Sequence, residues 1–298
     1  MQAFNKKNEK KILVTHNGTF HADDIFATAT LSILLDGNIE VTRTRDEDLI
    51  KNADFVYDVG GIFDATTNRF DHHQIGGAGK RENGVPYAAF GLVWKTYGEE
   101  ICGSKVIADN IDEGLVQAID SEDNGMKTYT IDGEGRPYVI QSIVNAFRPS
   151  WEEGEEYDKP FFKLVDFFKD FIIRKIKKEK DRLEAESFIQ KAYIEAKDKR
   201  LIVLDDQYPW RKTYMEYSEP LYVIVPKLEK WNVYCVQKEE NSFENRKDLP
   251  ASWAGLRDEE LAKVTGVSDA IFCHNGRFLA VAKSKKGAIE LAEKALLA

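Results

Sequence analysis

The sequence predicts an α/β protein with a doubly wound parallel sheet in a first domain and a second, smaller α+β domain that contains an antiparallel sheet. A length of 298 residues fits about two domains of ~150 residues each. Short apolar runs alternate with helical patterns up to about residue 125, and strand-like runs dominate the C-terminal part. We therefore expect a first domain at 1–160, a helical connector at 161–198 and a second domain at 199–298.

The first five elements follow a βαβαβ order, which is typical of a parallel sheet with right-handed crossovers. Asp23 and Asp24 lie in the first turn of the first expected helix, where carboxylates suit the positive helix end, and Asp36-Gly37 supplies a stop. The expected strands are 11–15, 39–43 and 55–59, and the expected helices are about 23–35 and 46–53.

The rest of the chain changes from helical to strand-like patterns. Residues 75–84 are rich in glycine and charge and predict a mobile loop, and residues 161–197 contain neither proline nor glycine, so we expect one or two long helices there. Asn275-Gly276 is a two-residue hairpin signal between the last two strands. Further helices are expected near 86–97 and 106–120 and from about Lys286 onward, and strands at 201–205, 221–225, 231–236, 270–274 and 277–282.

Composition narrows the class of protein. A net charge of −9 argues against a protein that coats nucleic acid through bulk electrostatics. The chain has no apolar run of about 18 residues, and its N-terminus has no signal-peptide pattern, so we expect no membrane association and a cytoplasmic location. The cysteines Cys102, Cys235 and Cys273 are far apart, which predicts buried thiols in a reducing compartment.

Four of the five histidines lie within residues 16–73, each with an aspartate nearby in sequence. His16 ends the first strand, and His21 and Asp23 stand at the entry to the following helix. Asp58 ends a later strand just before two glycines, at the carboxyl edge where parallel sheets bind ligands. The run that completes this cluster is Asp71-His72-His73.

The pattern as a whole points to a metal site, although each residue alone has another reading. A lone Asp58 could cap a turn, and a lone His16 could be a hydrogen-bonded, partly buried imidazole. Mixed imidazole and carboxylate ligands suit Mn²⁺, Fe²⁺ or Zn²⁺, and several carboxylates favour two ions. Two ions about 3.5–4 Å apart can hold the attacking and leaving oxygens of a phosphodiester. Phosphoester hydrolysis is the chemistry that such a cluster favours.

The same residues resemble the DHH phosphoesterase superfamily, and within it the Myg family, the melanocyte-proliferating-gene exonucleases. The resemblance runs almost end to end and rests on ordered segments. Besides the histidine segments already quoted, they are VTRTRD (41–46), DVGGIFD (58–64), AIDSEDNG (118–125) and SFENRKDLPASWAGLRDEEL (242–261).

The resemblance implies two divalent ions, Mn²⁺ first and Mg²⁺ as the alternative, held in a cleft between a parallel-sheet domain and a smaller domain. His16 and His21 would hold one ion, Asp23 and His72 the other, and Asp58 would bridge them. The superfamily's first motif usually reads H-x3-D-x-D, whereas this chain reads H-x4-H-x-D. His21 therefore stands where the superfamily has an aspartate.

The resemblance also implies roles around the ions. His73 would act on the substrate phosphate, and Asp71 would orient the histidines. The last ligand would be Asp120 or Asp123, which lie three residues apart and could share one helical face; alternatively, Asp123 only caps the helix end.

In the second domain, phosphate contacts are expected from basic side chains, and Trp253 could stack on a base. For each of them a solvated charge or a core aromatic is the competing reading. The basic candidates are Arg246, Arg257, His274 and Arg277.

Three functions fit these observations. The first is an exonuclease that releases nucleotides from single-stranded RNA, or DNA, by two-metal-ion hydrolysis. The second is a hydrolase of pyrophosphate or short oligonucleotides, for which Ser284-Lys285-Lys286 offers only a faint signature. The third is a non-catalytic module that binds metal or nucleotide. The expected partner is a single-stranded nucleic acid or oligonucleotide, and the oligomeric state stays open.

Overall fold

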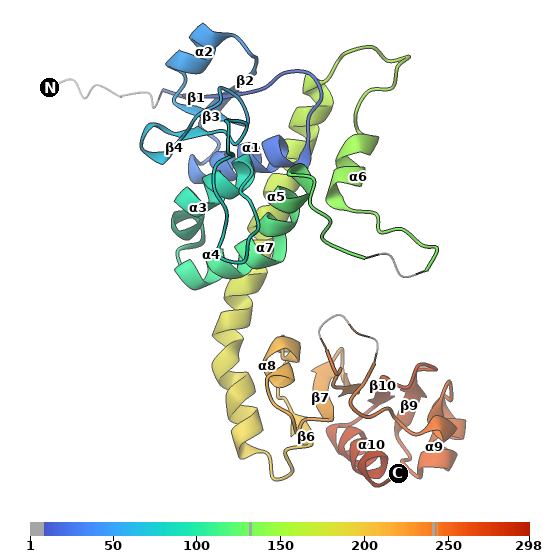
Figure 1. Cartoon of the computed structure of the whole chain (residues 1–298). Helices are drawn as coiled ribbons and strands as arrows, with labels where there is room; N and C mark the ends of the chain where they lie inside the picture. The colour runs from blue at the N-terminus through green and yellow to red at the C-terminus, as the bar shows by residue number, and fades with distance from the viewer. Residues whose placement is uncertain (1–8, 131–132, 240–241, 243) are drawn as a thin grey trace, which may run out of the picture. The chain divides into compact units, whose positions relative to one another are not determined.

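The structure, a computed structural model, describes residues 9–130, 133–239, 242 and 244–298. The N-terminal residues 1–8, on which the expectation about a signal peptide partly rests, lie outside the described residues. The chain divides into two compact units, residues 1–180 and 181–298 (Figure 1). Within the described residues each unit contains a five-stranded mixed sheet with helices, which confirms the α/β class. The three-part division with a separate connector stays a prediction.

The sheet of the first unit has the strand order β2-β1-β3-β5-β4. Four of its strands are parallel, and β4 runs antiparallel to β5 at one edge. The expected parallel sheet is therefore mixed, because the chain doubles back through a tight turn at Asn68, whose φ is +58°. The strands are β1 Lys11–Thr15, β2 Ile39–Arg43, β3 Phe55–Tyr57, β4 Phe63–Asp64 and β5 Arg69–Phe70.

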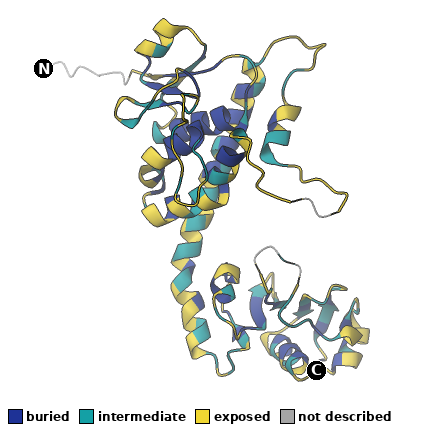
Figure 2. Ribbon diagram, viewed as in Figure 1, coloured by how far each residue is buried: buried dark blue, intermediate teal, exposed yellow. Residues whose placement is uncertain are grey.

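Helix α1, Ala22–Leu34, is buried along nearly all of its length and contacts α3 (Figure 2). The backbone N–H of His21 donates to Asp24 Oδ1 at 2.8 Å, which fixes the start of this helix. The helix expected at 106–120 contains a π-helical turn, Asp112–Val116. The other helices of this unit are α2 Glu47–Asn52, α3 Ala89–Cys102, α4 Lys105–Ile111, α5 Gln117–Asp123 and α6 Ile140–Ala146.

A single helix, α7, runs from Asp158 to Glu195. It is 38 residues long, and its Pro160 sits in the first turn, where a missing N–H is tolerated. The division between the two units falls inside this helix. In the described part of the chain, no helix combines the length and the apolar character that crossing a bilayer requires.

The second unit is built on a sheet of order β6-β7-β8-β10-β9. Here β6 is parallel to β7, whereas the other neighbours are antiparallel, so the expected antiparallel sheet is also mixed. The crossover through α8 brings the chain back in the same direction. The elements are β6 Leu201–Val203, α8 Arg211–Met215, β7 Tyr222–Lys227, β8 Lys230–Cys235, α9 Asp258–Thr265, β9 Ala270–Cys273, β10 Leu279–Ala282 and α10 Lys285–Leu297.

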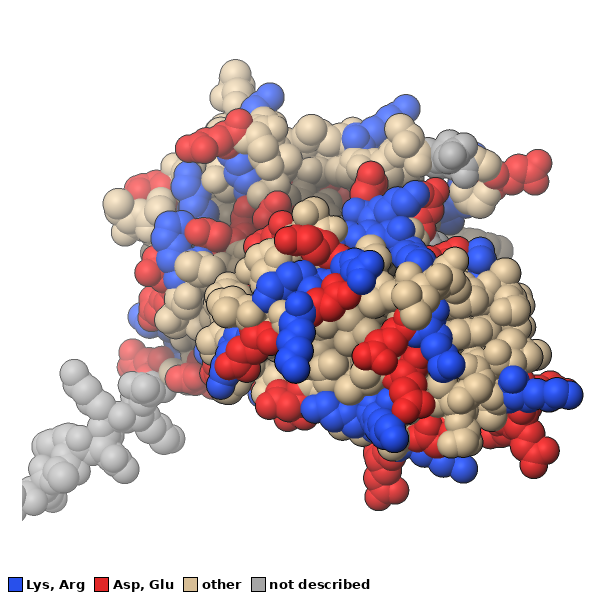
Figure 3. Space-filling view, turned by 90° about the horizontal axis from the view of Figure 1, so that it is seen from below, with Lys and Arg blue, Asp and Glu red and all other residues tan. Residues whose placement is uncertain are grey.

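Two sequence expectations for the second unit need correction. The β9–β10 hairpin is present, but its loop is longer than two residues: His274 N–H donates to Leu279 O, and the left-handed residue is Arg277 (φ +57°) rather than Gly276. Trp253 is buried in the core, so its ring is not available to stack on a base. The face seen in Figure 3 carries side chains of both charges. All three cysteines are buried and free, as predicted.

Candidate metal centre

The candidate site lies at the carboxyl edge of the first sheet. Strands β1, β3 and β5 are neighbours and parallel, so the residues that follow them come together. A cavity of about 1020 Å³ opens there. Its lining includes the predicted residues His16, His21, Asp58, Asp71, His72, His73 and Asp123.

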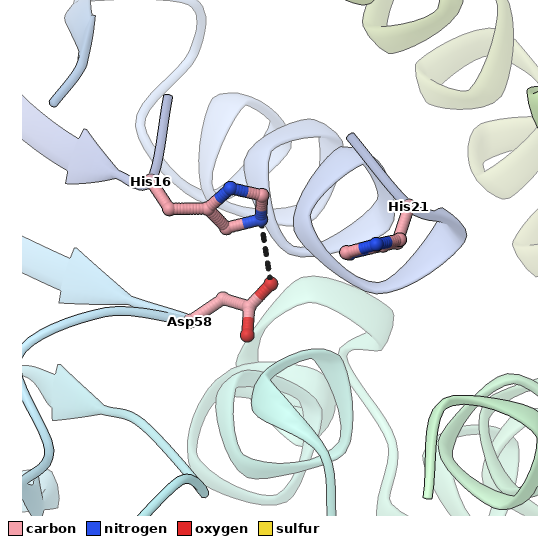
Figure 4. A group of neighbouring side chains, drawn as sticks. All are labelled: His16, His21 and Asp58. Carbon is pink, nitrogen blue, oxygen red and sulfur yellow. Dashed lines mark ion pairs between the residues drawn. The ribbon is translucent and has the colours of Figure 1, made fainter. Parts of the chain in front are cut away.

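Asp58 and His16 form the centre of the site. His16 Nε2 lies 3.2 Å from Asp58 Oδ2, and the His21 ring faces the same space from the start of α1 (Figure 4). Asp58 adopts a left-handed conformation with φ of +56°, and its N–H donates to Phe70 O. Non-glycine residues rarely adopt this conformation, and such strain is often retained where a side chain must be aimed. The turn at Asp58 therefore directs its carboxylate into the cavity.

Asp71 organises the run that follows β5. Its Oδ1 accepts from the backbone N–H groups of His72 and His73 and lies 2.8 Å from His73 Nδ1, while its Oδ2 accepts from Gly61 N–H. His72 Nε2 lies 3.5 Å from Asp58 Oδ1 and points into the buried side of the cavity, whereas the His73 side chain is 62% exposed. The two adjacent imidazoles thus have different surroundings.

Asp23 is buried beneath the cavity and is held by helix α3. Its two oxygens accept from the N–H groups of Ala89 and Phe90, the start of that helix. A carboxylate oxygen retains a further lone pair, so these bonds leave Asp23 able to bind a cation.

Within the part of the chain that the structure describes, three groups of side chains could hold a metal ion, each with ligand atoms within 4.8 Å of one another. Asp58 belongs to two of them and His72 also to two, so the groups form one connected cluster. The groups are His16–His21–Asp58, Asp58–His72–His73 and Asp23–His72–Asp123.

The residues fit divalent cations because imidazole nitrogens and carboxylate oxygens face one another at 3.2 Å without a well-directed hydrogen bond between them. Among the described residues, His16 Nε2, His72 Nε2 and Asp24 Oδ2 are buried without a hydrogen bond. Buried polar atoms are nearly always hydrogen-bonded in folded proteins. Nitrogen and carboxylate ligand atoms gathered in this way form a donor set suited to Mn²⁺ or Zn²⁺ and, through the oxygens, to Mg²⁺.

The ionisation of the acidic groups also favours a bound cation at this site. Burial opposes ionisation of Asp58, yet the His16 and His72 imidazoles hold the pKa of its carboxyl far below the usual range. Burial lowers the pKa of His16, but Asp24 and Asp58 outweigh it and raise this pKa to about 10. Burial and the nearby Asp123 raise the pKa of Asp23. Asp58 thus stays ionised beside other acidic groups, and such a cluster of negative charge attracts cations.

The structure separates the two aspartates of α5 that the sequence left open. Asp120 is buried, lies 2.7 Å from Arg81 Nη1 and accepts from Gly91 N–H. Burial raises the pKa of Asp120 to about 7, although Arg81 opposes this shift. Asp123 lies 3.2 Å from His72 Nε2, and among the described residues only Asp123 of this pair belongs to a metal-ligand group.

The basic residues predicted to bind phosphate in the second unit contact neighbouring groups of the same unit. The Arg246 guanidinium donates to the backbone carbonyls of Met215, Tyr217 and Pro220, which makes it a structural residue of its loop. Arg257 is exposed and lies over the Phe272 ring. His274 Nδ1 accepts from Gly276 N–H, and Arg277 pairs with Asp248 at 2.7 Å.

Sequence reasoning missed three residues of the cavity region. Asp24 Oδ2 lies 3.2 Å from His16 Nε2, and its adjacency to Asp23 was the available signal. Arg45 and Arg148 line the cavity, and Arg148 Nε donates to Phe20 O at 2.9 Å. No sequence pattern joins Arg148 to a residue so far away in the chain.

Comparison with known proteins was made for the whole chain. Residues 12–296 match the family described as Uncharacterised protein family (UPF0160), designated MYG1_exonuc. A MYG1 protein of Caenorhabditis elegans is 30% identical over 324 residues, covering 96% of this chain and 95% of the relative. The MYG1 exonuclease of Homo sapiens is 26% identical over 335 residues, covering 98% and 88%. A MYG1 protein of Schizosaccharomyces pombe is 27% identical over 314 residues, covering 95% and 97%.

Proposed function

The chain belongs to the MYG1 exonuclease family, and we propose that it is a metal-dependent phosphodiesterase that releases nucleotides from the end of single-stranded RNA, or DNA, with two divalent ions. The observation that carries this proposal is the connected cluster in which Asp58 and His72 each belong to two potential ligand groups. A single ion would not use all of these side chains. The name of the family indicates the reaction, and the cluster provides side chains that could hold the ions for it.

Under this proposal His16 and His21 hold one ion, Asp23, His72 and Asp123 hold the other, and Asp58 lies between them. Mn²⁺ is the expected ion and Mg²⁺ the alternative, because imidazole nitrogens suit Mn²⁺ better. Bound ions would supply the Lewis acidity that stabilises the charge developing on a phosphoryl group and would activate water near neutral pH.

The chain's own contribution is orientation. Asp71 Oδ1 holds His73 at Nδ1, so the other ring nitrogen is free to donate to a substrate phosphate. Asp71 raises the pKa of His73, which favours the doubly protonated imidazole needed for that donation. His73 is exposed enough to meet a substrate, whereas His72 is not.

The finer fold assignment belongs to the same proposal. A doubly wound, DHH-type first domain is supported by the strand order, in which β2 and β3 lie on opposite sides of β1. Arg257 directly precedes α9, and His274 and Arg277 lie in the β9–β10 loop. All three are at least partly exposed, which supports the proposal that they contact the substrate.

The test offers the purified protein 5′-labelled single-stranded RNA, single-stranded DNA, dinucleotides and pyrophosphate with Mn²⁺ or Mg²⁺. A stepwise ladder from long RNA is the expected result, and Asp58→Ala should abolish it. Asp48→Ala, an exposed carboxylate on α2, is the matched control. Turnover of the smallest substrates alone would contradict the exonuclease and favour a small-phosphate hydrolase, and metal binding without any turnover would favour a binding module.

A further inference from the structure

A second cavity, of about 810 Å³, adjoins the metal cavity. It is lined by α5, the segment that follows α5, and the start of α6. Helices α5 and α6, which Figure 1 labels, contact each other. Its volume is within the range of about 300–1,000 Å³ that is usual for small-molecule sites. Its apolar and aromatic lining includes Ile119, Met126, Tyr129, Tyr138, Val139 and Ile140.

The two cavities share a wall. Glu122 on α5 lines both of them, and it directly precedes the metal-site residue Asp123. On the other side, Val139 and Ile140 face the apolar cavity, whereas Gln141 and Asn145 of α6 line the metal cavity. A ligand with its charged end among the histidines can therefore extend past Glu122 into the apolar cavity.

The lining of the second cavity exposes large apolar and aromatic side chains. Tyr138 is 73% exposed, Tyr129 is 48% exposed and Met126 is 44% exposed. Exposed aromatic rings beside a candidate metal centre suit a flat, π-faced group, because base stacking on tyrosine is favourable for every base. A nucleotide combines this flat group with a phosphate, in the order in which the two cavities lie.

We propose that this cavity binds the nucleobase of the nucleotide whose phosphate lies at the metal centre, with Tyr129 and Tyr138 as its stacking residues. This inference rests on the proposed function for its phosphate site. It makes the pocket tolerant of base identity, because stacking discriminates little between bases. It also separates recognition of the base, by the segment between α5 and α6, from the chemistry at the strand ends.

The test measures binding rather than turnover. Isothermal titration of the full-length protein with Mn²⁺ compares adenosine monophosphate with ribose 5-phosphate, which lacks the base and is otherwise similar. Stacking predicts that the nucleotide binds roughly 5- to 150-fold more tightly. Tyr129→Leu with Tyr138→Leu should remove most of this preference, and the corresponding double phenylalanine variant should keep it. Trp151→Leu, at a 90% exposed aromatic outside both cavities, is the matched control.

Three results would overturn the inference: equal affinity for the two ligands, no binding of either, or a preference that survives in the double leucine variant. Thermal melting and Mn²⁺ binding of each variant show that it is folded and metal-competent. Degradation of labelled RNA is measured in parallel. If the unsubstituted protein shows no base preference but degrades RNA, the pocket alone is refuted. If it shows the preference but does not degrade RNA, the exonuclease is refuted.

Discussion

Replacing Gly91 by alanine should destabilise the protein, although the same change usually stabilises a helix. Gly91 lies in α3, where glycine costs about 1 kcal/mol relative to alanine. A Cβ on Gly91 would meet Asp120 Oδ2 at 1.8 Å and Asp120 Cγ at 2.6 Å. The backbones of α3 and α5 cannot move apart freely, because the two helices pack against each other. The Asp120 side chain must therefore move away from Arg81.

The magnitude follows from that displaced pair. Separating a buried ion pair costs about 3–5 kcal/mol, and the helical gain of roughly 1 kcal/mol offsets part of this cost. We expect a net loss of about 2–4 kcal/mol in the free energy of unfolding. Because α5 also carries Asp123, Mn²⁺ affinity should fall with stability.

Urea unfolding followed by circular dichroism measures the change, and Gly114→Ala is the control, because a Cβ there meets nothing within 4 Å. The decisive comparison is a double-mutant cycle with Asp120→Ala. In that background Gly91→Ala should be neutral or stabilising. If Gly91→Ala costs the same with and without the Asp120 carboxylate, the clash is not the cause and the reasoning is refuted.

Four further changes test the site. Asp123→Ala should weaken Mn²⁺ binding measured by titration calorimetry far more than Asp120→Asn does; equal losses would contradict the separation of their roles. His73→Ala should lower kcat about 10- to 100-fold with unchanged metal stoichiometry, and a loss of bound metal would instead make His73 a ligand. Mn²⁺ at 100 times its Kd should stabilise the protein by about 2.7 kcal/mol, seen as a higher Tm that a chelator reverses; an unchanged Tm would argue against a folded-state metal site. Arg43→Met removes the donation from Nη2 to Gly18 O and should cost about 1–3 kcal/mol in urea unfolding, whereas Arg45→Met, at an exposed position, should cost little.

The strands and helices around the site could be predicted because their signals are local. β1 and α1 lie within one or two residues of their expected bounds, and the candidate ligands His16 and Asp58 stand directly after strands. Hydrophobic period, helix-end charges and glycine turns act over a few residues, so they can be read without knowing the fold. The short strands β4 and β5 escaped this reasoning because two residues carry no period.

The sequence by itself determined the α/β class, the family and a compact set of histidines and aspartates at strand ends. Only the tertiary structure decided where those residues lie relative to one another. Asp120 and Asp123 are one helical turn apart and look equivalent in the sequence, but Arg81, from a distant loop, pairs with the first and leaves the second beside His72. Side chains that meet across distant segments depend on packing, and local sequence patterns do not encode that packing.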